Sequence, residues 1–294
     1  MTSQYIINQL VNGLCQGFIY ALVALGVAVI IGIVGFATFT HGEVVMVGAY
    51  TAFYVFTSAG NHLVLGLLAS FATTWVLGMV IYKVCYEHFL DAPEHISLLC
   101  TIGFSMLLKN LATIVFGVEK KPMLDIINNK IYHFGPIQVT KVQLVIMATV
   151  LIICLILVLV FTKTNLGIRL KAVSQNREAA ALVGINVRTT AMIGNCIGCA
   201  MAGIAGTLIG IYYQSAYATM GSILSVKGFT SATLGGLTDV PLSALGGVLI
   251  GIMENLGIAF TSASYRDIFS FGFLIIMLIF KPNGFAKKRG GARA

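Results

Sequence analysis

The stretch from Val142 to Phe161 constrains the fold more than any other part of this sequence. Its residues are apolar except for Gln143 and Thr149. A helix of about 20 apolar residues can cross the hydrocarbon core of a bilayer, and a helix that is apolar on every face is a buried or membrane-spanning one. The stretch therefore predicts a transmembrane helix.

Further apolar runs extend this prediction along the whole chain. They cover residues 6–34, 44–59, 62–84, 96–116, 190–213, 223–237, 243–261 and 266–280. Charged residues make up only 10% of the 294 residues, against roughly 25% in soluble domains, and the mean hydropathy is +0.94. We therefore expect an all-α polytopic membrane protein with about eight or nine transmembrane helices. The runs 44–59, 223–237 and 266–280 are short, and either or both of the first two could be broken or re-entrant helices.

The basic residues predict the orientation of the chain. Segment 163–188 holds five Lys or Arg against one acid, and the tail 281–294 holds Lys281, Lys287, Lys288, Arg289 and Arg293. Because loops on the cytoplasmic side are enriched in Lys and Arg, both segments should be cytoplasmic. Counting back through nine crossings then places the N-terminus outside. The first residues lack the basic region of a signal peptide, so we expect the first apolar run to be retained.

The centre of the basic segment predicts a short helix. It reads Glu178-Ala179-Ala180-Ala181-Leu182-Val183-Gly184. An acid is favoured near a helix N-terminus, and a glycine can end a helix with a left-handed cap. The alanines would keep one helix face flat enough to lie in a groove of a soluble partner.

Four ionisable residues fall at membrane depth: Glu43, Lys109, Lys227 and Glu254. Such residues cost free energy unless they face the protein interior or water, so they are candidate functional residues. Glu254, with Asn255 beside it, should face protein, either in a structural pair with Lys227 or in contact with a substrate. Lys109 lies toward the outer half of its run, where its amine could simply reach for the membrane surface.

Glu43 belongs to the sequence Thr40-His41-Gly42-Glu43. A Thr three residues before a Glu is the pattern of a capping box, which would place a helix N-terminus at a break in the membrane. The alternative is that this acid lines or gates a substrate path. The spacing alone leaves both interpretations open.

Small residues recur at every fourth position of three runs, which predicts close helix packing. The three sets are Gly13, Gly17 and Ala21; Gly194, Gly198, Ala202, Gly206 and Gly210; and Ser243, Gly247, Gly251 and Asn255. Small residues at this spacing let helix backbones approach closely in lipid. Tight static packing and helices that slide during gating are both compatible with the pattern.

Several short motifs, taken together, resemble the permease subunits of branched-chain amino-acid ABC importers, the LivH type. In order they are Asn12-Gly13-Leu14, Thr40-His41-Gly42-Glu43, Glu178-Ala179-Ala180 to Gly184-Ile185-Asn186, Ala202-Gly203-Ile204-Ala205-Gly206, Lys227-Gly228-Phe229, Leu234-Gly235-Gly236, Tyr265-Arg266-Asp267 and Lys281-Pro282-Asn283-Gly284. The match runs nearly end to end. Thr38 and Thr40 replace the Asn and Ala that the family usually has, which leaves the exact substrate open.

The resemblance implies one permease domain over residues 1–294, in a bacterial or archaeal cytoplasmic membrane. Its partners would be a second related permease or a second copy, two ATPase subunits and an extracytoplasmic binding protein. The coupling loop, about 163–189, would dock on the ATPases through Arg169, Arg177, Glu178, Ala179, Ala180 and Gly184. Candidates for the translocation path or gate are His41, Glu43, Lys227, Glu254 and Asn255.

Other functions remain open at this point. A related ABC permease could carry urea, small amides or sugars, and an ion-coupled carrier could use the intramembrane acids Glu43 and Glu254. The sequence contains no glycine-rich phosphate loop ending in Lys-Ser/Thr and no HExxH motif, so we expect no enzymatic activity, cofactor or metal site in this chain.

Overall fold

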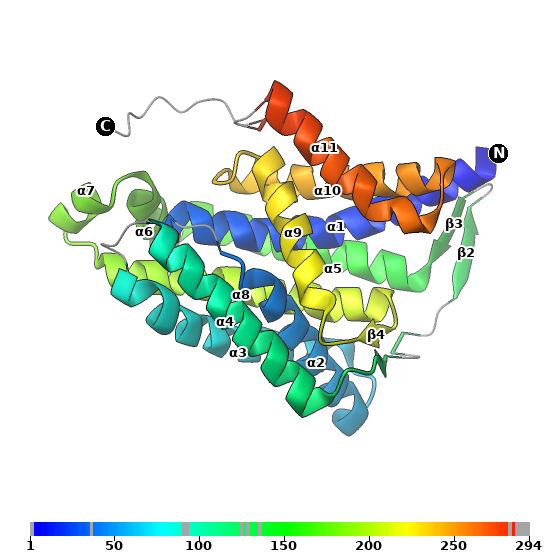
Figure 1. Ribbon diagram of the computed structural model, residues 1–294, viewed down its shortest axis with the longest axis horizontal. Coiled ribbons are helices and arrows are strands. Elements are labelled where there is room, and N and C mark those ends of the chain that lie inside the picture. The colour runs from blue at the N-terminus through cyan, green and yellow to red at the C-terminus, as the bar shows by residue number, and fades with distance from the viewer. Residues whose placement is uncertain are drawn as a thin grey trace.

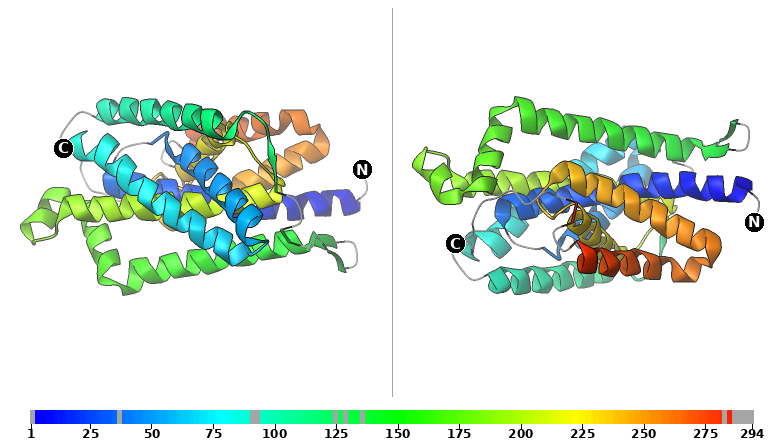
Figure 2. Two further views of the ribbon diagram at one scale, coloured as in Figure 1. Left: turned by 90° about the horizontal axis from the view of Figure 1, so that it is seen from below. Right: turned by 90° about the horizontal axis from the view of Figure 1, so that it is seen from above.

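The computed structural model describes residues 3–35, 38–89, 94–123, 126–127, 130–134, 137–281 and 284–285. These residues form an elongated bundle in which long helices run along the main axis (Figures 1 and 2). The N-terminus lies at one end of the bundle, and the short helices α6 and α7 lie at the other. The basic segment and the N-terminus therefore sit at opposite ends, as the predicted orientation requires.

Helices make up most of the described chain. In order they are α1 (Ser3–Val34), α2 (His41–Ala59), α3 (Leu63–Ile81), a π-helical turn (Tyr82–Tyr86) with a 3₁₀ turn (Glu87–Phe89), α4 (Glu94–Phe116), α5 (Lys141–Lys163), α6 (Asn165–Gln175), α7 (Arg177–Leu182), α8 (Val187–Tyr212), α9 (Met220–Leu234), α10 (Val240–Phe260), a 3₁₀ turn (Ala263–Tyr265) and α11 (Arg266–Phe280).

Six of the described helices are long and apolar enough to cross a membrane. They span Gln4–Val34, Leu63–Phe89, His95–Phe116, Lys141–Lys163, Val187–Tyr212 and Val240–Phe260. Each matches a predicted run to within a few residues. The three short runs are helical too, as α2, α9 and α11, but these helices are not both long and apolar enough to be counted as membrane spans. A polytopic membrane protein is confirmed, while eight or nine crossings stay a prediction.

Two small sheets qualify the prediction of a purely helical chain. Strand β1 (Lys121–Pro122) pairs antiparallel with β4 (Ser215–Ala216), and β2 (Ile131–Phe134) pairs antiparallel with β3 (Ile137–Thr140). They lie in connecting segments rather than in the apolar runs, and β2 and β3 sit at the N-terminal end of the bundle (Figure 1). The β1–β4 pair ties the α4–α5 connection to the α8–α9 connection.

Small residues hold the centre of the bundle together, as their spacing predicts. A side chain at Gly251 of α10 would collide with the backbone of Gly17 in α1, and one at Gly13 would meet the Gly251 carbonyl oxygen at 2.9 Å. On α8, Gly198 packs against α1, while Gly206 packs against the α2 backbone. Close backbone packing is confirmed.

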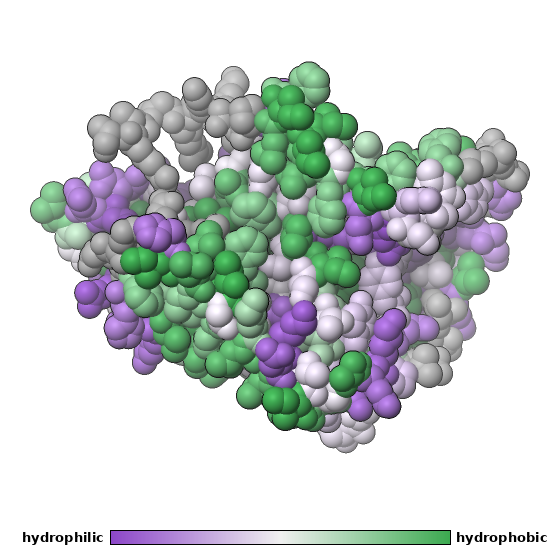
Figure 3. Space-filling model, in the orientation of Figure 1, coloured by the Kyte–Doolittle hydropathy of each residue, from purple (hydrophilic) through white to green (hydrophobic). Residues whose placement is uncertain are grey.

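The helices differ in how much of their surface is buried inside the bundle. Most residues of α1 and α8 are buried inside the bundle, whereas few residues of α4 and α5 are buried. Figure 3 shows hydrophobic side chains over the middle of one face, interrupted by smaller hydrophilic patches, and further hydrophilic side chains toward both ends. An apolar middle between polar ends is the surface expected of a protein that spans a bilayer.

Candidate functional site

Two short helices begin inside the bundle, and their N-termini meet. Both α2 and α9 start part-way along the bundle rather than at one of its ends (Figure 1). Their first turns touch at Gly42 and Gly221, where a side chain on Gly221 would lie 2.6 Å from the Gly42 carbonyl oxygen. Within the described part of the chain, neither helix has a side-chain N-cap hydrogen bond. The contact, which we call the α2–α9 junction, therefore brings together two helix ends that carry partial positive charge.

Glu43 lies in this junction with an incomplete set of partners. Its side chain is 2% exposed, and Oε1 accepts a 3.4 Å hydrogen bond from the Ser222 hydroxyl of α9. Among the described residues, Oε2 has no partner at hydrogen-bonding distance and angle. Lys109 of α4 donates to the same Ser222 hydroxyl over 3.3 Å, and Ser105 of α4 also faces the carboxylate.

These contacts correct two predictions. Thr40 does not form a capping box with Glu43, because its backbone is already helical (φ −71°, ψ −20°) and its hydroxyl donates to the Thr101 carbonyl of α4. An N-cap side chain needs the extended conformation to reach back over the first turn. Lys109 does not reach for the membrane surface; its amine turns inward to Ser222 of α9.

His41, the other candidate in this motif, is packed away. Its ring is 1% exposed and lies against Gly26 of α1, where any side chain would come within 2.7 Å of the ring. This position makes His41 part of the contact between α1 and α2. A role on the translocation path stays a prediction.

The remaining path candidates gather in a second polar cluster. Glu254 of α10 is fully buried, and the Lys227 amine of α9 lies 3.0 Å from each of its carboxylate oxygens. This confirms the predicted pair. Arg266 Nε lies 2.9 Å from Glu254 Oε1, and the Ser270 hydroxyl donates to Oε2 over 2.9 Å. Lys227 also pairs with Asp267 at 2.9 Å. Two cations and two carboxylates therefore balance one another.

Neutral groups complete this cluster from α1 and the α8–α9 connection. The Asn255 amide donates to Gln16 Oε1 over 2.8 Å, and Gln16 Nε2 donates to the Tyr213 hydroxyl over 2.6 Å. We call the set Gln16, Tyr20, Tyr213, Lys227, Glu254, Asn255, Arg266, Asp267 and Ser270 the Glu254 cluster.

The basic segment folds into α6 and α7, and its predicted helix ends are confirmed. Asn176 caps α7 by accepting a 3.0 Å hydrogen bond from the Ala179 amide. Gly184 has φ +83°, and the amides of Gly184 and Ile185 bond back to Ala181 and Ala180, each over 3.0 Å. This is a Schellman motif, in which a glycine supplies the left-handed residue.

The faces of α7 differ from the prediction. Ala180 is 3% exposed and packs against the rest of the chain, so it cannot contribute to a free docking face. Arg177 turns inward as well and donates to the Val34 carbonyl at the end of α1. Arg169, Glu178 and Ala179 are exposed.

Sequence reasoning missed the apolar tip of α7. Leu182 and Val183 are 89% and 76% exposed at the end of the bundle that holds α6 and α7. Two adjacent apolar side chains at the tip of a basic polar loop are the kind of exposed feature that marks a contact with another protein. That local contrast was visible in the sequence.

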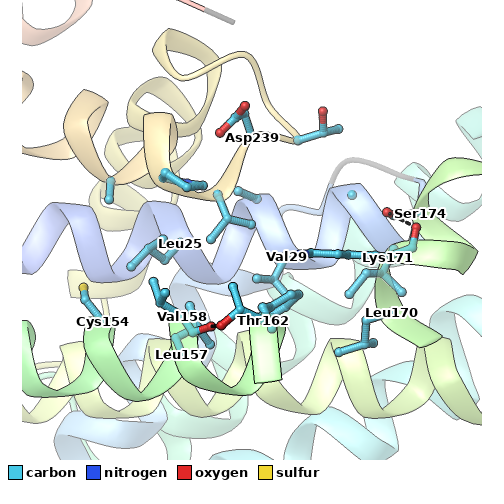
Figure 4. Close-up of a pocket in the computed structure, with 18 residues that line it drawn as sticks. Leu25, Val29, Cys154, Leu157, Val158, Thr162, Leu170, Lys171, Ser174 and Asp239 are labelled. Atoms are coloured by element: carbon cyan, nitrogen blue, oxygen red, sulfur yellow. Dashed lines mark hydrogen bonds between the residues drawn. The ribbon is translucent and has the colours of Figure 1, made fainter. Parts of the chain in front are cut away.

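A cavity of about 490 Å³ lies beside the base of this segment. Figure 4 shows Leu25 and Val29 of α1 and Leu157 of α5 on its wall, with Lys171 of α6 and Asp239 before α10 among its polar residues. The lining is mostly apolar, and none of the candidate site residues belongs to it. The cavity leaves free space between α6 and the helices that it packs against.

Comparisons with known proteins agree with this architecture. The family model described as the branched-chain amino acid transport system permease component matches residues 9–278. The chain is 31% identical over 291 residues to BraD, a high-affinity branched-chain amino acid transport system permease protein of Pseudomonas aeruginosa; the match covers 95% of this chain and 94% of BraD.

Further relatives come from a second bacterium and from an archaeon. LivH of Escherichia coli K12, a permease protein of the same kind of system, is 30% identical over 95% of each chain. A probable LivH of Methanocaldococcus jannaschii is 27% identical over 90% of this chain and 87% of its own length. No solved structure gave a significant match. The chain therefore belongs to the family of permease components of branched-chain amino acid transport systems.

Proposed function

We propose that this chain forms the membrane passage of an importer that moves branched-chain or other small neutral amino acids into the cytoplasm. As a member of its family with six long apolar helices in the described part of the chain, the protein is a multi-pass protein of the cytoplasmic membrane. Membership of an ABC permease family implies ATPase and binding-protein partners. The substrate proposal rests on the named transport systems of the relatives.

The proposed assembly contains a second permease or a second copy, two ATPase subunits and an extracytoplasmic binding protein. ATP hydrolysis belongs to the ATPases, so this chain needs no cofactor and has no enzymatic activity of its own. The N-terminus faces outward, and α6, α7 and the tail face the cytoplasm. One permease domain covers the chain, with residues 163–189 as its coupling loop.

The observation that carries this proposal is the exposed apolar tip of α7. Leu182 and Val183 would fill a groove on an ATPase, with Glu178 and Arg169 at its polar rim. Arg177 and Ala180 then act from the inner face, where they attach α7 to the bundle. Gly184 ends the helix and sets the angle of the tip.

Movement of the tip would reach the membrane helices through α1. Arg177 bonds to the last carbonyls of α1, so a push on α7 is delivered to that helix first. The cavity beside α6 gives the segment room to shift without compressing packed side chains. A small displacement at an interface can then select between two packed arrangements of the bundle.

The test is ATP hydrolysis by the reconstituted complex, stimulated by leucine-loaded binding protein. Leu182→Asp should lower the stimulation at least about ten-fold, because it places a charge in an apolar contact of the hot-spot kind. Leu182→Met keeps an apolar side chain and is the matched control. Normal stimulation in Leu182→Asp would remove the tip from the coupling path, and an absence of ATPase from the purified wild-type complex would favour an ion-coupled carrier.

A further inference from the structure

We propose that the α2–α9 junction binds the charged end of the transported amino acid. The α-carboxylate lies against Lys109 and Ser222, and the α-ammonium lies against Glu43. This inference rests on the proposed transport function and assigns the groups that handle the zwitterion. It also assigns a role to Ser222, which the sequence analysis did not single out, and to Lys109, for which that analysis gave no specific role.

The charge of the junction favours an added carboxylate. Each helix N-terminus carries about half an elementary charge, so the ends of α2 and α9 together with Lys109 outweigh Glu43 by about one positive charge. Among the described residues no side chain caps either helix, and the first-turn amides of Glu43 and Met220 donate to the backbone carbonyls of Thr40 and Tyr217. Interrupted helices that point their N-termini at an anionic group are a recurring way to hold a substrate inside a membrane.

The unpaired carboxylate oxygen points to a missing cation. Glu43 Oε2 is buried without a hydrogen-bond partner among the described residues, a state that protein interiors seldom tolerate. The oxygen occupies space left by Gly221, where any side chain would come within 2.6 Å of it. An ammonium group that reaches Oε2, beside the Ser105 hydroxyl that faces the same carboxylate, would complete the shell of the carboxylate.

The two charges of the junction are held apart rather than paired. Ser222 Oγ lies 3.3 Å from Lys109 Nζ and 3.4 Å from Glu43 Oε1, so it stands between them. No direct Lys109–Glu43 ion pair within 4.0 Å occurs in the described residues, unlike the pairs of the Glu254 cluster. A cation and an anion separated by one hydroxyl match the opposite charges of an α-amino acid.

The surroundings of the junction suit an aliphatic side chain. Ser222 and Lys109 are half buried, so the junction reaches the surface of the bundle. Val226 and Phe229 follow Ser222 along α9 at helical spacing, and Phe229 stacks on Phe39 with ring centroids 6.3 Å apart. Val226 and Phe39 are 39% and 37% exposed. This apolar strip begins where the charged groups end.

The experiment measures weak ligand binding directly, without the binding protein that selects the substrate. Saturation-transfer NMR on the detergent-purified complex of permeases and ATPases compares leucine, 4-methylvalerate, which lacks the ammonium, and isoamylamine, which lacks the carboxylate. We expect the wild-type complex to bind leucine best. It should bind 4-methylvalerate more tightly than isoamylamine, because the junction carries surplus positive charge.

Substitutions separate the two ends of the ligand. Glu43→Gln should abolish the preference for leucine over 4-methylvalerate. Lys109→Met should weaken the binding of both ligands that carry a carboxylate, leucine and 4-methylvalerate, by at least about ten-fold, since a hydrogen bond to a charged group is lost. Lys83→Met removes an exposed lysine outside the junction and should leave the binding of both ligands unchanged. Size-exclusion profiles confirm that each variant assembles.

The possible failures differ from one another. Two outcomes would overturn the assignment of the junction: the same ligand preferences in the wild type and all three variants, or no ligand signal because the second permease fills the junction. In either case, leucine uptake by the wild-type complex would still uphold the transport function. No ATP-dependent leucine uptake by reconstituted wild type would overturn the proposed function, and this assignment with it.

Discussion

Two buried carboxylates in the bundle have opposite surroundings. Glu254 is contacted by Lys227, Arg266 and Ser270, and the wider cluster balances two cations with two acids. Glu43 has one hydrogen bond from Ser222 and a buried oxygen without a partner in the described chain. Glu43 lies in the first turn of the short helix α2, and Glu254 lies within the long helix α10; in both places an unpaired charge is costly.

We propose that this difference separates a structural site from a binding site. The Glu254 cluster joins α1, α9, α10 and α11 and leaves no open position on its carboxylate. A satisfied network of this kind fixes helices against one another. The α2–α9 junction, in contrast, is incomplete, so its energy improves when a ligand arrives.

The largest expected effect comes from breaking the satisfied site. Glu254→Leu should lower the free energy of unfolding by about 3 kcal/mol, because removal of one partner leaves the buried Lys227 without its main counter-charge. Thermal unfolding of the purified protein in detergent, followed by fluorescence, measures the change.

A second variant controls for lost packing. Glu254→Leu combined with Lys227→Met removes both buried charges and should be more stable than Glu254→Leu alone. Equal stability of the single and double variants would mean that the ion pair does not hold α9 on α10, and the comparison of the two sites would fail.

An intermediate result is expected at the incomplete site, where function and stability should separate. Glu43→Gln should change the free energy of unfolding by less than about 1 kcal/mol, because no ion pair is lost, yet leucine uptake should fall at least about ten-fold. Unfolding curves and uptake by proteoliposomes are measured on the same preparation. A large loss of stability would make Glu43 a structural residue like Glu254.

The smallest effect should come from the exposed edge of the satisfied site. Asp267 pairs with Lys227 at 2.9 Å but is 48% exposed, so water replaces much of what the pair provides. Asp267→Asn should cost less than about 1 kcal/mol. A cost comparable to that of Glu254→Leu would show that the outer acid, and not the buried one, anchors Lys227.

Features set by local spacing could be predicted from the sequence. The apolar runs gave six of the helices to within a few residues, and the small-residue stripes gave the close contacts such as Gly17 with Gly251. The cap at Gly184 was also predictable, because a left-handed helix end depends on the residues around it. In each case, neighbouring residues carry the whole signal.

Features set by distant contacts could not be predicted. The Lys109 amine lies inside because α9, 113 residues further on, places Ser222 beside it. The Thr40 side chain does not cap α2 because its hydroxyl donates a hydrogen bond to the Thr101 carbonyl of α4. Ala180 is buried because α7 packs back onto the bundle. Periodicity states which residues share a helix face, but not which helix meets that face.

The interlocked glycines of α1 and α10 limit the motions available to the bundle. Backbone rests on backbone at Gly17 and Gly251, where any added side-chain atom would collide with the facing main chain, so there is no free space at this contact in which the helices could shift. The two helices must travel as one piece, about 48 Å long on the α1 side. Any change between inward and outward openings is therefore left to joints where side chains, not backbones, touch.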